Sequence, residues 1–130
     1  MSTFMLTGTY PIKISAQSTC LVSVSFDQHS AFENTIKFYD PAGELRYSFK
    51  RGDGKNHTFQ IDNNGDNQVT WVAWGQHLVP GQSEPLNDSY KVLSRNPPTP
   101  LPPKSIVVGY EDHGDSSYND IHMTLNYEYQ

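Results

Sequence analysis

The sequence is poor in cysteine and in long apolar runs, which several classes of protein require. Cys20 is the only cysteine in 130 residues, so an intrachain disulfide and a cysteine-based zinc cluster are both excluded. Because Cys20 lies in an alternating apolar run, we expect it to be a small buried hydrophobic residue. No apolar run approaches the length of a membrane span, which predicts no membrane insertion.

Basic residues are few as well. Nine Lys and Arg stand singly along the chain against 14 Asp and Glu, which gives a formal net charge of −5. Without a basic stripe there is nothing to neutralise a phosphate backbone, so nucleic acid is not an expected partner. The first residues also lack the basic and apolar regions of a signal peptide. We therefore expect synthesis in the cytoplasm, with release by a signal-independent route left open.

Motifs for catalysis are missing. The sequence has no nucleophile elbow, no Cys–His pattern and no glycine-rich phosphate loop, and its five histidines show no ligand spacing. The closest carboxylates fall within one loop, where a bound metal would already engage their charge, so they are poor glycosidase candidates. The sequence predicts a binding protein and not an enzyme.

Helical periodicity is absent, and apolar residues recur with period two instead. Alternation of this kind is typical of strands with one buried face. With the chain length, it predicts a single domain over residues 1–130, an all-β antiparallel sandwich of about nine strands. The expected strands are Thr7–Ile14, Cys20–Phe26, Thr35–Tyr39, Glu44–Phe49, His57–Asp62, Gln68–Trp74, Ser89–Leu93, Ser105–Tyr110 and Asp120–Tyr129.

Turn signals separate the expected strands. The segments Asp40-Pro41-Ala42-Gly43 and Asn63-Asn64-Gly65-Asp66 contain residues that preset or tolerate turn geometry. They predict two hairpins, over residues 35–49 and 57–74. Residues 96–103 include five prolines, which remove five backbone donors. We expect this segment to be a crossing connection on the surface, and a docking motif for a proline-reading domain is the alternative.

Acidic residues gather in one place. Four of the 14 Asp and Glu fall between residues 111 and 120, with no Lys or Arg among them. Packing these carboxylates together would cost mutual repulsion, which a bound divalent cation removes. Calcium takes about six to eight oxygen ligands, and this segment offers carboxylates, an Asn amide and backbone carbonyls. It predicts a calcium loop, and a polar turn without metal is the alternative.

The segment Val108-Gly109-Tyr110-Glu111-Asp112-His113-Gly114-Asp115-Ser116-Ser117-Tyr118-Asn119-Asp120 and the ten residues after it carry a resemblance. They resemble the C-terminal end of the soluble bacterial fucose- and mannose-binding lectins that use two calcium ions, the type B lectin family. The resemblance lies mainly in residues 107–130. It implies a calcium-dependent carbohydrate-binding lectin, a nine-stranded sandwich whose calcium ions contact vicinal sugar hydroxyls directly. It also implies a homodimer or higher homo-oligomer.

The resemblance also assigns roles to individual residues. By motif and by approximate position, the implied metal ligands are Glu111, Asp115, Asn119, Asp120 and Asp27. The implied sugar-binding residues are Asp112, Asp115, Asn119, Asp120, Gln28, His29, Ser30 and Gln130. Asp27 stands roughly where the family has an asparagine ligand. Gln130 stands where the family has a terminal glycine, whose carboxylate reaches into the neighbouring subunit's site.

Two points stay open within this interpretation. Ser117 stands where the family carries the aspartate that bridges its two ions, so both one and two calcium ions are compatible with the sequence. The sugar is also undetermined, because the loop over residues 27–31 differs from the family in charge and size. The second hypothesis is a calcium-stabilised structural or adhesion domain without sugar binding, because similar loops occur in exported bacterial sandwich domains. A metal-free interaction module is a third.

Overall fold

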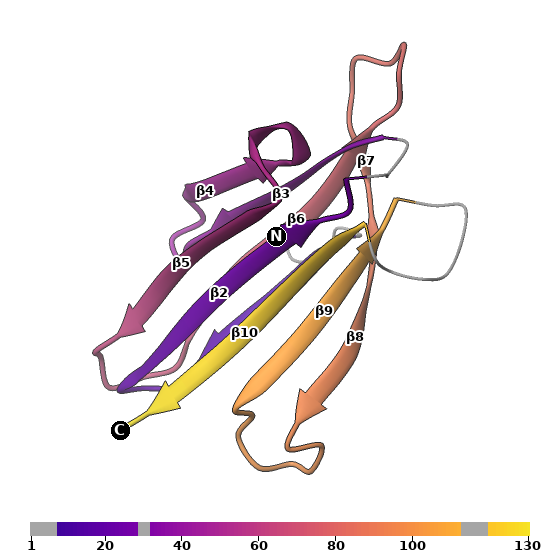
Figure 1. Ribbon diagram of the computed structural model, residues 1–130. Coiled ribbons are helices and arrows are strands. Elements are labelled where there is room, and N and C mark those ends of the chain that lie inside the picture. Colours follow the sequence, from indigo (N-terminus) through magenta and orange to yellow (C-terminus); the bar gives the residue numbers. More distant parts are fainter. Residues whose placement is uncertain (1–7, 29–31, 113–119) are drawn as a thin grey trace.

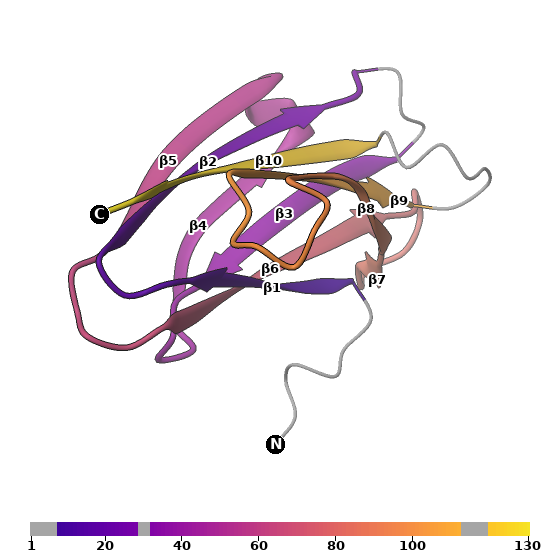
Figure 2. The same ribbon diagram turned by 90° about the horizontal axis from the view of Figure 1, so that it is seen from below.

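A computed structural model describes residues 8–28, 32–112 and 120–130 of the chain. These residues form two antiparallel sheets that pack face to face, as the two layers of Figure 2 show. The described residues contain ten strands and one 3-10 turn at Arg51–Asp53. The expected all-β sandwich is confirmed, and each of the nine expected strands is found. No helix in the described residues is long and apolar enough to cross a membrane.

The first sheet has the strand order β1-β6-β3-β4, and the short β7 pairs with β6 beyond the first residue of β1. A strand of two residues carries no alternation, so β7 could not be predicted from periodicity. The bounds of these strands are β1 Thr9–Ile14, β3 Glu33–Tyr39, β4 Leu45–Lys50, β6 Val69–Leu78 and β7 Leu86–Asn87.

The second sheet has the order β5-β2-β10-β9-β8, and its strands lie side by side in that order in Figure 1. Its central ladder pairs β2 with β10 from Phe26 opposite Ile121 to Ser18 opposite Tyr129. The carboxyl end of β2 therefore lies beside the start of β10. The bounds are β2 Ser18–Phe26, β5 Asn56–Asn63, β8 Ser89–Asn96, β9 Ser105–Glu111 and β10 Ile121–Tyr129.

The core lies between the sheets and is built from alternate residues of each strand. In β2 the side chains of Cys20, Val22 and Val24 are buried while those between them are not. Across the core, the rings of Phe38 and Phe59 meet edge to face with their centroids 4.8 Å apart. Each fully buried large apolar side chain stabilises the fold by about 1.5–3 kcal/mol. The expectation that Cys20 is buried is confirmed.

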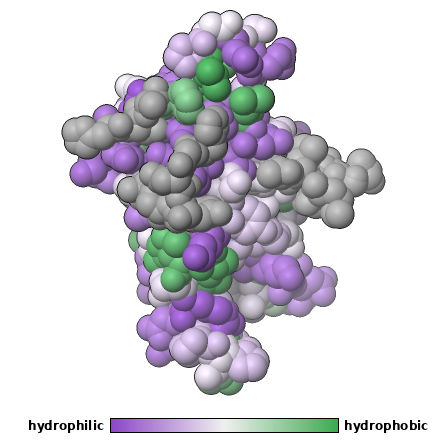
Figure 3. Space-filling model, turned by 90° about the vertical axis from the view of Figure 1, so that its right-hand side faces the viewer, coloured by the Kyte–Doolittle hydropathy of each residue, from purple (hydrophilic) through white to green (hydrophobic). Residues whose placement is uncertain are grey.

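The surface on the β8 side carries hydrophobic side chains in separate groups among hydrophilic ones (Figure 3). Exposed hydrophobic residues of β8 include Val92 and Leu93, which are 41% and 40% exposed. β8 is an edge strand of its sheet, so one side of it pairs with no strand of the described chain. Two half-exposed aliphatic residues are ordinary for a protein surface.

The hairpin predicted over residues 35–49 is confirmed, because β3 and β4 pair directly. The Asp40 side chain closes the turn by accepting hydrogen bonds from the backbone N–H groups of Ala42 at 2.9 Å and Glu44 at 3.0 Å. Gly43 has φ +86°, in the left-handed region that glycine adopts without strain. The turn residues therefore act as their types predict.

The hairpin predicted over residues 57–74 is wrong. β5 pairs with β2 in the second sheet, whereas β6 pairs with β1 and β3 in the first. The turn between them crosses from one sheet to the other, and the buried Asn63 side chain ties it down. Its Nδ2 donates to the carbonyl oxygens of Ile14 at 3.1 Å, Ser15 at 3.0 Å and Asn67 at 2.9 Å. Alternation predicts a strand but does not specify its partner, so strands that are adjacent along the chain need not pair.

The proline-rich segment lies on the surface, as expected, but it does not cross the sandwich. It joins β8 to β9, which pair with each other from Ser89 opposite Glu111 to Asn96 opposite Ser105. The segment is therefore the loop of a hairpin. Its prolines lie beyond the ladder, where the missing backbone donors cost nothing.

Candidate metal centre

Three carboxylates meet at one end of the second sheet. Glu111 is the last residue of β9, Asp112 follows it, and Asp120 directly precedes β10. One oxygen from each carboxylate lies within 4.8 Å of the others, a spacing that a single metal ion could bridge. All three residues are buried, with 6%, 7% and 6% of their surface exposed. The acidic segment singled out from the sequence thus contains a cluster of oxygens that could bind a metal ion.

Backbone hydrogen bonds hold this cluster in place. The N–H of Asp120 donates to the carbonyl oxygen of Tyr110 at 3.0 Å, and the N–H of Asp112 donates to Oδ2 of Asp120 at 2.9 Å. The first bond lies just past the last pair of the β9–β10 ladder, Tyr110 opposite Ile121, and the second ties the backbone of Asp112 to the side chain of Asp120. The two ends of the segment between Asp112 and Asp120 are therefore joined by the sheet itself.

The end of β2 reaches the same place. The N–H of Asp27 donates to the carbonyl oxygen of Asp120 at 3.0 Å. β10 pairs with β2 on one side and with β9 on the other, which explains why residues almost a hundred positions apart meet here (Figure 1). The predicted ligand Asp27 thus has its backbone beside the cluster.

The electrostatics of the cluster favour a cation. Burial raises the pKa of Asp120 above its usual range, and the charge of Asp112 contributes to the rise. Carboxylates this close repel one another when ionised, and burial strengthens the repulsion by excluding water. A hard divalent cation would relieve that repulsion, and oxygen ligands are those that calcium prefers.

A buried histidine–aspartate pair accompanies the cluster. Nδ1 of His77, on β6, lies 2.6 Å from Oδ1 of Asp88, the residue between β7 and β8. Burial raises the pKa of Asp88 to about 8, and the charges of Asp112 and Asp120 contribute. Burial lowers the pKa of His77. Burial thus favours the uncharged form of each side chain, a carboxylic acid beside a neutral imidazole.

Sequence reasoning missed this pair. Asp88 is where the chain passes from the first sheet to the second, and its neighbour Ser89 lies opposite Glu111 in the β8–β9 ladder. Neither residue belongs to a metal-binding or catalytic motif, and their spacing along the chain carries no signal. Only the pairing of β6, β7, β8 and β9 brings them together.

The predicted site residues divide into three groups. The structure brings together Glu111, Asp112 and Asp120, and it places Asp112 among the potential metal ligands although the resemblance implied only a sugar contact. Gln28 follows Asp27 and is exposed. The predicted site residues that lie outside the described ones are His29, Ser30, Asp115 and Asn119, and so does Ser117, the position that left the number of calcium ions open.

Gln130 lies far from the cluster within one chain. β10 has nine residues, which span about 30 Å at the usual rise per residue, and Gln130 follows its far end. There its N–H donates to the carbonyl oxygen of Gln17 at 3.2 Å. A contact of Gln130 with a neighbouring subunit's site stays a prediction.

Several solved structures are similar to this chain along nearly its whole length. Matches among solved structures include the Chromobacterium violaceum lectin CV2L in complex with alpha-methyl-fucoside, 22% identical over 93% of this chain and 96% of that one, with a TM-score of 0.52. The C-terminal domain of the BC2L-C lectin from Burkholderia cenocepacia is 21% identical over 93% and 95%, with a TM-score of 0.50. A high-affinity mannose-binding lectin from Ralstonia solanacearum is 18% identical over 93% and 96%, with a TM-score of 0.48.

The first two of these matches show that the chain shares the fold of bacterial lectins along nearly its whole length. The resemblance stated from the C-terminal motif thus extends to the two-sheet architecture. No family model matches the sequence, and no curated protein matches it.

Proposed function

We propose that this protein is a calcium-dependent carbohydrate-binding lectin in which bound calcium coordinates sugar hydroxyls directly. The observation that carries the proposal is the convergence of Glu111, Asp112 and Asp120 within 4.8 Å on a fold shared with bacterial lectins. The proposed activity is recognition without reaction. It agrees with the absence of catalytic motifs from the sequence.

The chemistry follows from the coordination demand of the ion. Calcium takes about six to eight oxygens, so three carboxylates leave positions to be filled by other groups. We expect Asp115, Asn119 and Asp27 to supply part of the remainder. A pair of vicinal sugar hydroxyls would replace water at the last positions. Because both hydroxyls must reach one ion, the stereochemistry of the diol would select the sugar.

Titration calorimetry with methyl α-fucoside and methyl α-mannoside tests the proposal. In millimolar calcium we expect binding of at least one of the two glycosides, and in excess chelator we expect none. If neither glycoside binds in calcium, this choice of ligands is refuted. If a glycoside still binds in excess chelator, the coordination of the sugar by calcium is refuted.

The role of Asp27 has its own test. Its backbone lies beside the cluster, so a carboxylate on its side chain would be close enough to help hold the ion. We expect Asp27→Ala to lower calcium affinity about tenfold, as loss of a charged ligand should. The control is Glu44→Gln, in the turn between β3 and β4, which removes one exposed charge. Unchanged calcium affinity in Asp27→Ala would exclude Asp27 as a ligand.

A second function is supported by the burial of the three carboxylates, each less than a tenth exposed. An ion so enclosed would serve mainly to rigidify the β9–β10 connection, as in a structural or adhesion domain. Such a protein should melt at a higher temperature with calcium, because the ion binds only the folded state. A calcium-raised melting temperature without binding to any glycan on an array would favour this function over the lectin.

We also propose that the lectin is a homodimer or a larger homo-oligomer, whose several sites bind clustered glycans with avidity. Sedimentation velocity measures the oligomeric state directly. If Gln130 enters a neighbouring site, its deletion should weaken sugar binding while the calcium-free melting temperature stays unchanged. A monomeric sedimentation coefficient at micromolar concentration would contradict the oligomer.

A further inference from the structure

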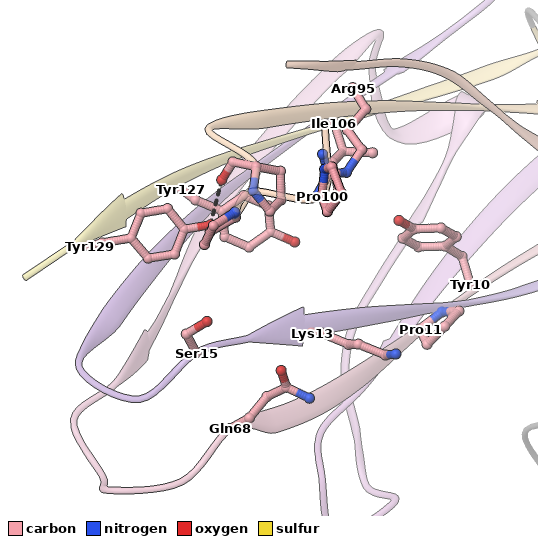
Figure 4. A pocket seen from close by; sticks show the side chains of 12 residues that line it. Tyr10, Pro11, Lys13, Ser15, Gln68, Arg95, Pro100, Ile106, Tyr127 and Tyr129 are labelled. Carbon is pink, nitrogen blue, oxygen red and sulfur yellow. Dashed lines mark hydrogen bonds between the residues drawn. The ribbon is translucent and has the colours of Figure 1, made fainter. Parts of the chain in front are cut away.

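A cleft lies near the opposite end of β10 from the candidate metal centre. It has a volume of about 440 Å³ and opens between the free edge of β1 and the proline-rich β8–β9 loop (Figure 4). Lys13, Ser15 and Gln68 lie on one side of it, and Arg95, Pro100 and Tyr127 lie on the other. Its size is that of a small-molecule site, for which volumes of about 300–1,000 Å³ are usual.

The charges of the cleft are unlike those of the rest of the protein. Two of its lining residues are charged, Lys13 and Arg95, and both are basic, although the whole chain has a formal net charge of −5. Among the described residues, no Asp or Glu lines the cleft. The electrostatic potential inside it therefore favours an anion.

The loop holds the guanidinium of Arg95 in position. Its Nη2 donates to the carbonyl oxygen of Leu101 at 2.7 Å, and its Nη1 donates to the carbonyl oxygens of Pro97 and Thr99. These acceptors are uncharged, so the positive charge of Arg95 is fixed in the wall without being neutralised by them. Lys13 is exposed and free to reach a ligand in the cleft.

Rings and hydrogen-bonding groups complete the lining. The rings of Tyr127 and Tyr129 are nearly parallel, with an interplanar angle of 7°. The hydroxyl of Tyr129 is held by the carbonyl oxygen of Pro103, and that of Tyr127 is hydrogen-bonded with the buried Cys20. The hydroxyl of Tyr10 points into the cavity (Figure 4). Tyrosine rings offer flat apolar faces to the C–H groups of a sugar, and their hydroxyls bind its oxygens.

We propose that this cleft is a second carbohydrate site, independent of calcium, that takes a pyranose carrying a carboxylate. Lys13 and Arg95 bind the carboxylate, the tyrosine rings contact the sugar ring, and Ser15 and Gln68 bind its hydroxyls. The proposal stands apart from the metal centre, because the two sites lie at opposite ends of a nine-residue strand.

The test uses the whole protein in excess chelator, so that the metal centre takes no part. Titration calorimetry compares D-glucuronate, D-glucose and benzoate. We expect glucuronate to bind about tenfold more tightly than glucose, because only glucuronate makes charge-assisted hydrogen bonds. We expect it to bind more tightly than benzoate as well, because benzoate lacks hydroxyls for the polar side chains. Equal affinities for glucuronate and glucose, tighter binding of benzoate, or no binding of glucuronate would each overturn the proposal.

Two variants locate the binding. Lys13→Gln removes one exposed charge from the cleft and should weaken glucuronate binding about tenfold while leaving glucose affinity unchanged. The matched control is Lys37→Gln on β3, a residue that is not part of the lining, and it should change neither affinity. If Lys13→Gln binds glucuronate as tightly as the wild type does, or if Lys37→Gln weakens it equally, the cleft is not the site.

Discussion

The ring of Tyr110 packs directly on the backbone of Gly75, so closely that a Cβ built on Gly75 would lie 2.4 Å from Cδ1 of the ring. Tyr110 is fully buried and directly precedes Glu111, and its backbone carbonyl oxygen accepts the hydrogen bond from Asp120. The contact joins β6 of the first sheet to the metal centre at the end of the second. We therefore expect a side chain at residue 75 to displace the Tyr110 ring and, with it, the start of the acidic cluster.

Gly75→Ala should destabilise the protein by about 1–3 kcal/mol, because the added methyl group forces the buried ring to move. Urea unfolding in the presence of chelator measures the change. Gly65→Ala is the control, because a Cβ there would meet its nearest atom only at 3.4 Å, and we expect a change below about 0.5 kcal/mol. Wild-type stability in Gly75→Ala would show that the ring is not packed against this glycine.

Asp120→Asn should have opposite effects with and without calcium. Asn keeps an oxygen that can accept the hydrogen bond from Asp112, but it removes a charge that burial and Asp112 disfavour. Without calcium we expect the variant to be more stable by about 1 kcal/mol. With calcium we expect a smaller rise in melting temperature than in the wild type, because one charged ligand is lost.

Thermal unfolding in chelator and in millimolar calcium measures both effects of Asp120→Asn, and Glu44→Gln serves as the charge control. If the variant gained as much stability from calcium as the wild type does, Asp120 would not be a ligand.

The Asp88 carboxyl should make stability depend on pH. Its pKa is about 8 in the folded protein and 3.8 by reference, so the folded state holds the proton more tightly than the unfolded chain. The contribution of the group to the free energy of unfolding is therefore fully present below the reference pKa and is lost as the pH rises through the folded pKa. Between about pH 5 and about pH 7, the loss should be about 1 kcal/mol per pH unit.

Asp88→Asn isolates this contribution, because Asn keeps a donor for Nδ1 of His77 but does not titrate. Urea unfolding of both proteins across this pH range in chelator gives the difference in stability. We expect the stability of Asp88→Asn relative to that of the wild type to increase as the pH rises. A difference that does not change with pH would mean that Asp88 is ionised in the folded protein throughout the range.

Asn63→Ala should destabilise the crossing between β5 and β6. The side-chain amide of Asn63 donates to three backbone carbonyl oxygens and its Oδ1 accepts from the N–H of Gly65 at 3.1 Å. Loss of buried partners costs about 1–3 kcal/mol. Urea unfolding should show this loss, and Asn64→Ala, at the exposed neighbouring position, should change stability by less than about 0.5 kcal/mol. Equal stabilities of the two variants would show that the turn does not depend on Asn63.

Most of the strands could be predicted from the sequence, and the pairing of several could not. Alternation in β2 and β10 reports a local property, namely which side of the chain is buried, so the buried state of Cys20 followed from it. The partner of β5 is a non-local property. It depends on which turn crosses the sandwich, and the buried amide of Asn63 that ties down this crossing looks from the sequence like an ordinary turn residue.

In the candidate site, too, some residues could be predicted from the sequence and others could not. Glu111, Asp112 and Asp120 were recognised because they are close along the chain and have one chemistry, and a short hairpin connection keeps such residues together in space. The pair of His77 and Asp88 was invisible, because strand pairing alone brings these residues within 2.6 Å.

By itself, therefore, the sequence determined the period of the strands, the residues of the core and the acidic character of the β9–β10 connection. Each of these properties depends only on residues that are close together along the chain. Only the tertiary structure decided which strands cross between the sheets and which side chains lie under the acidic cluster. It also decided that two basic residues, Lys13 and Arg95, line one cleft. Contacts between distant segments depend on how the two sheets pack, and no local pattern records that packing.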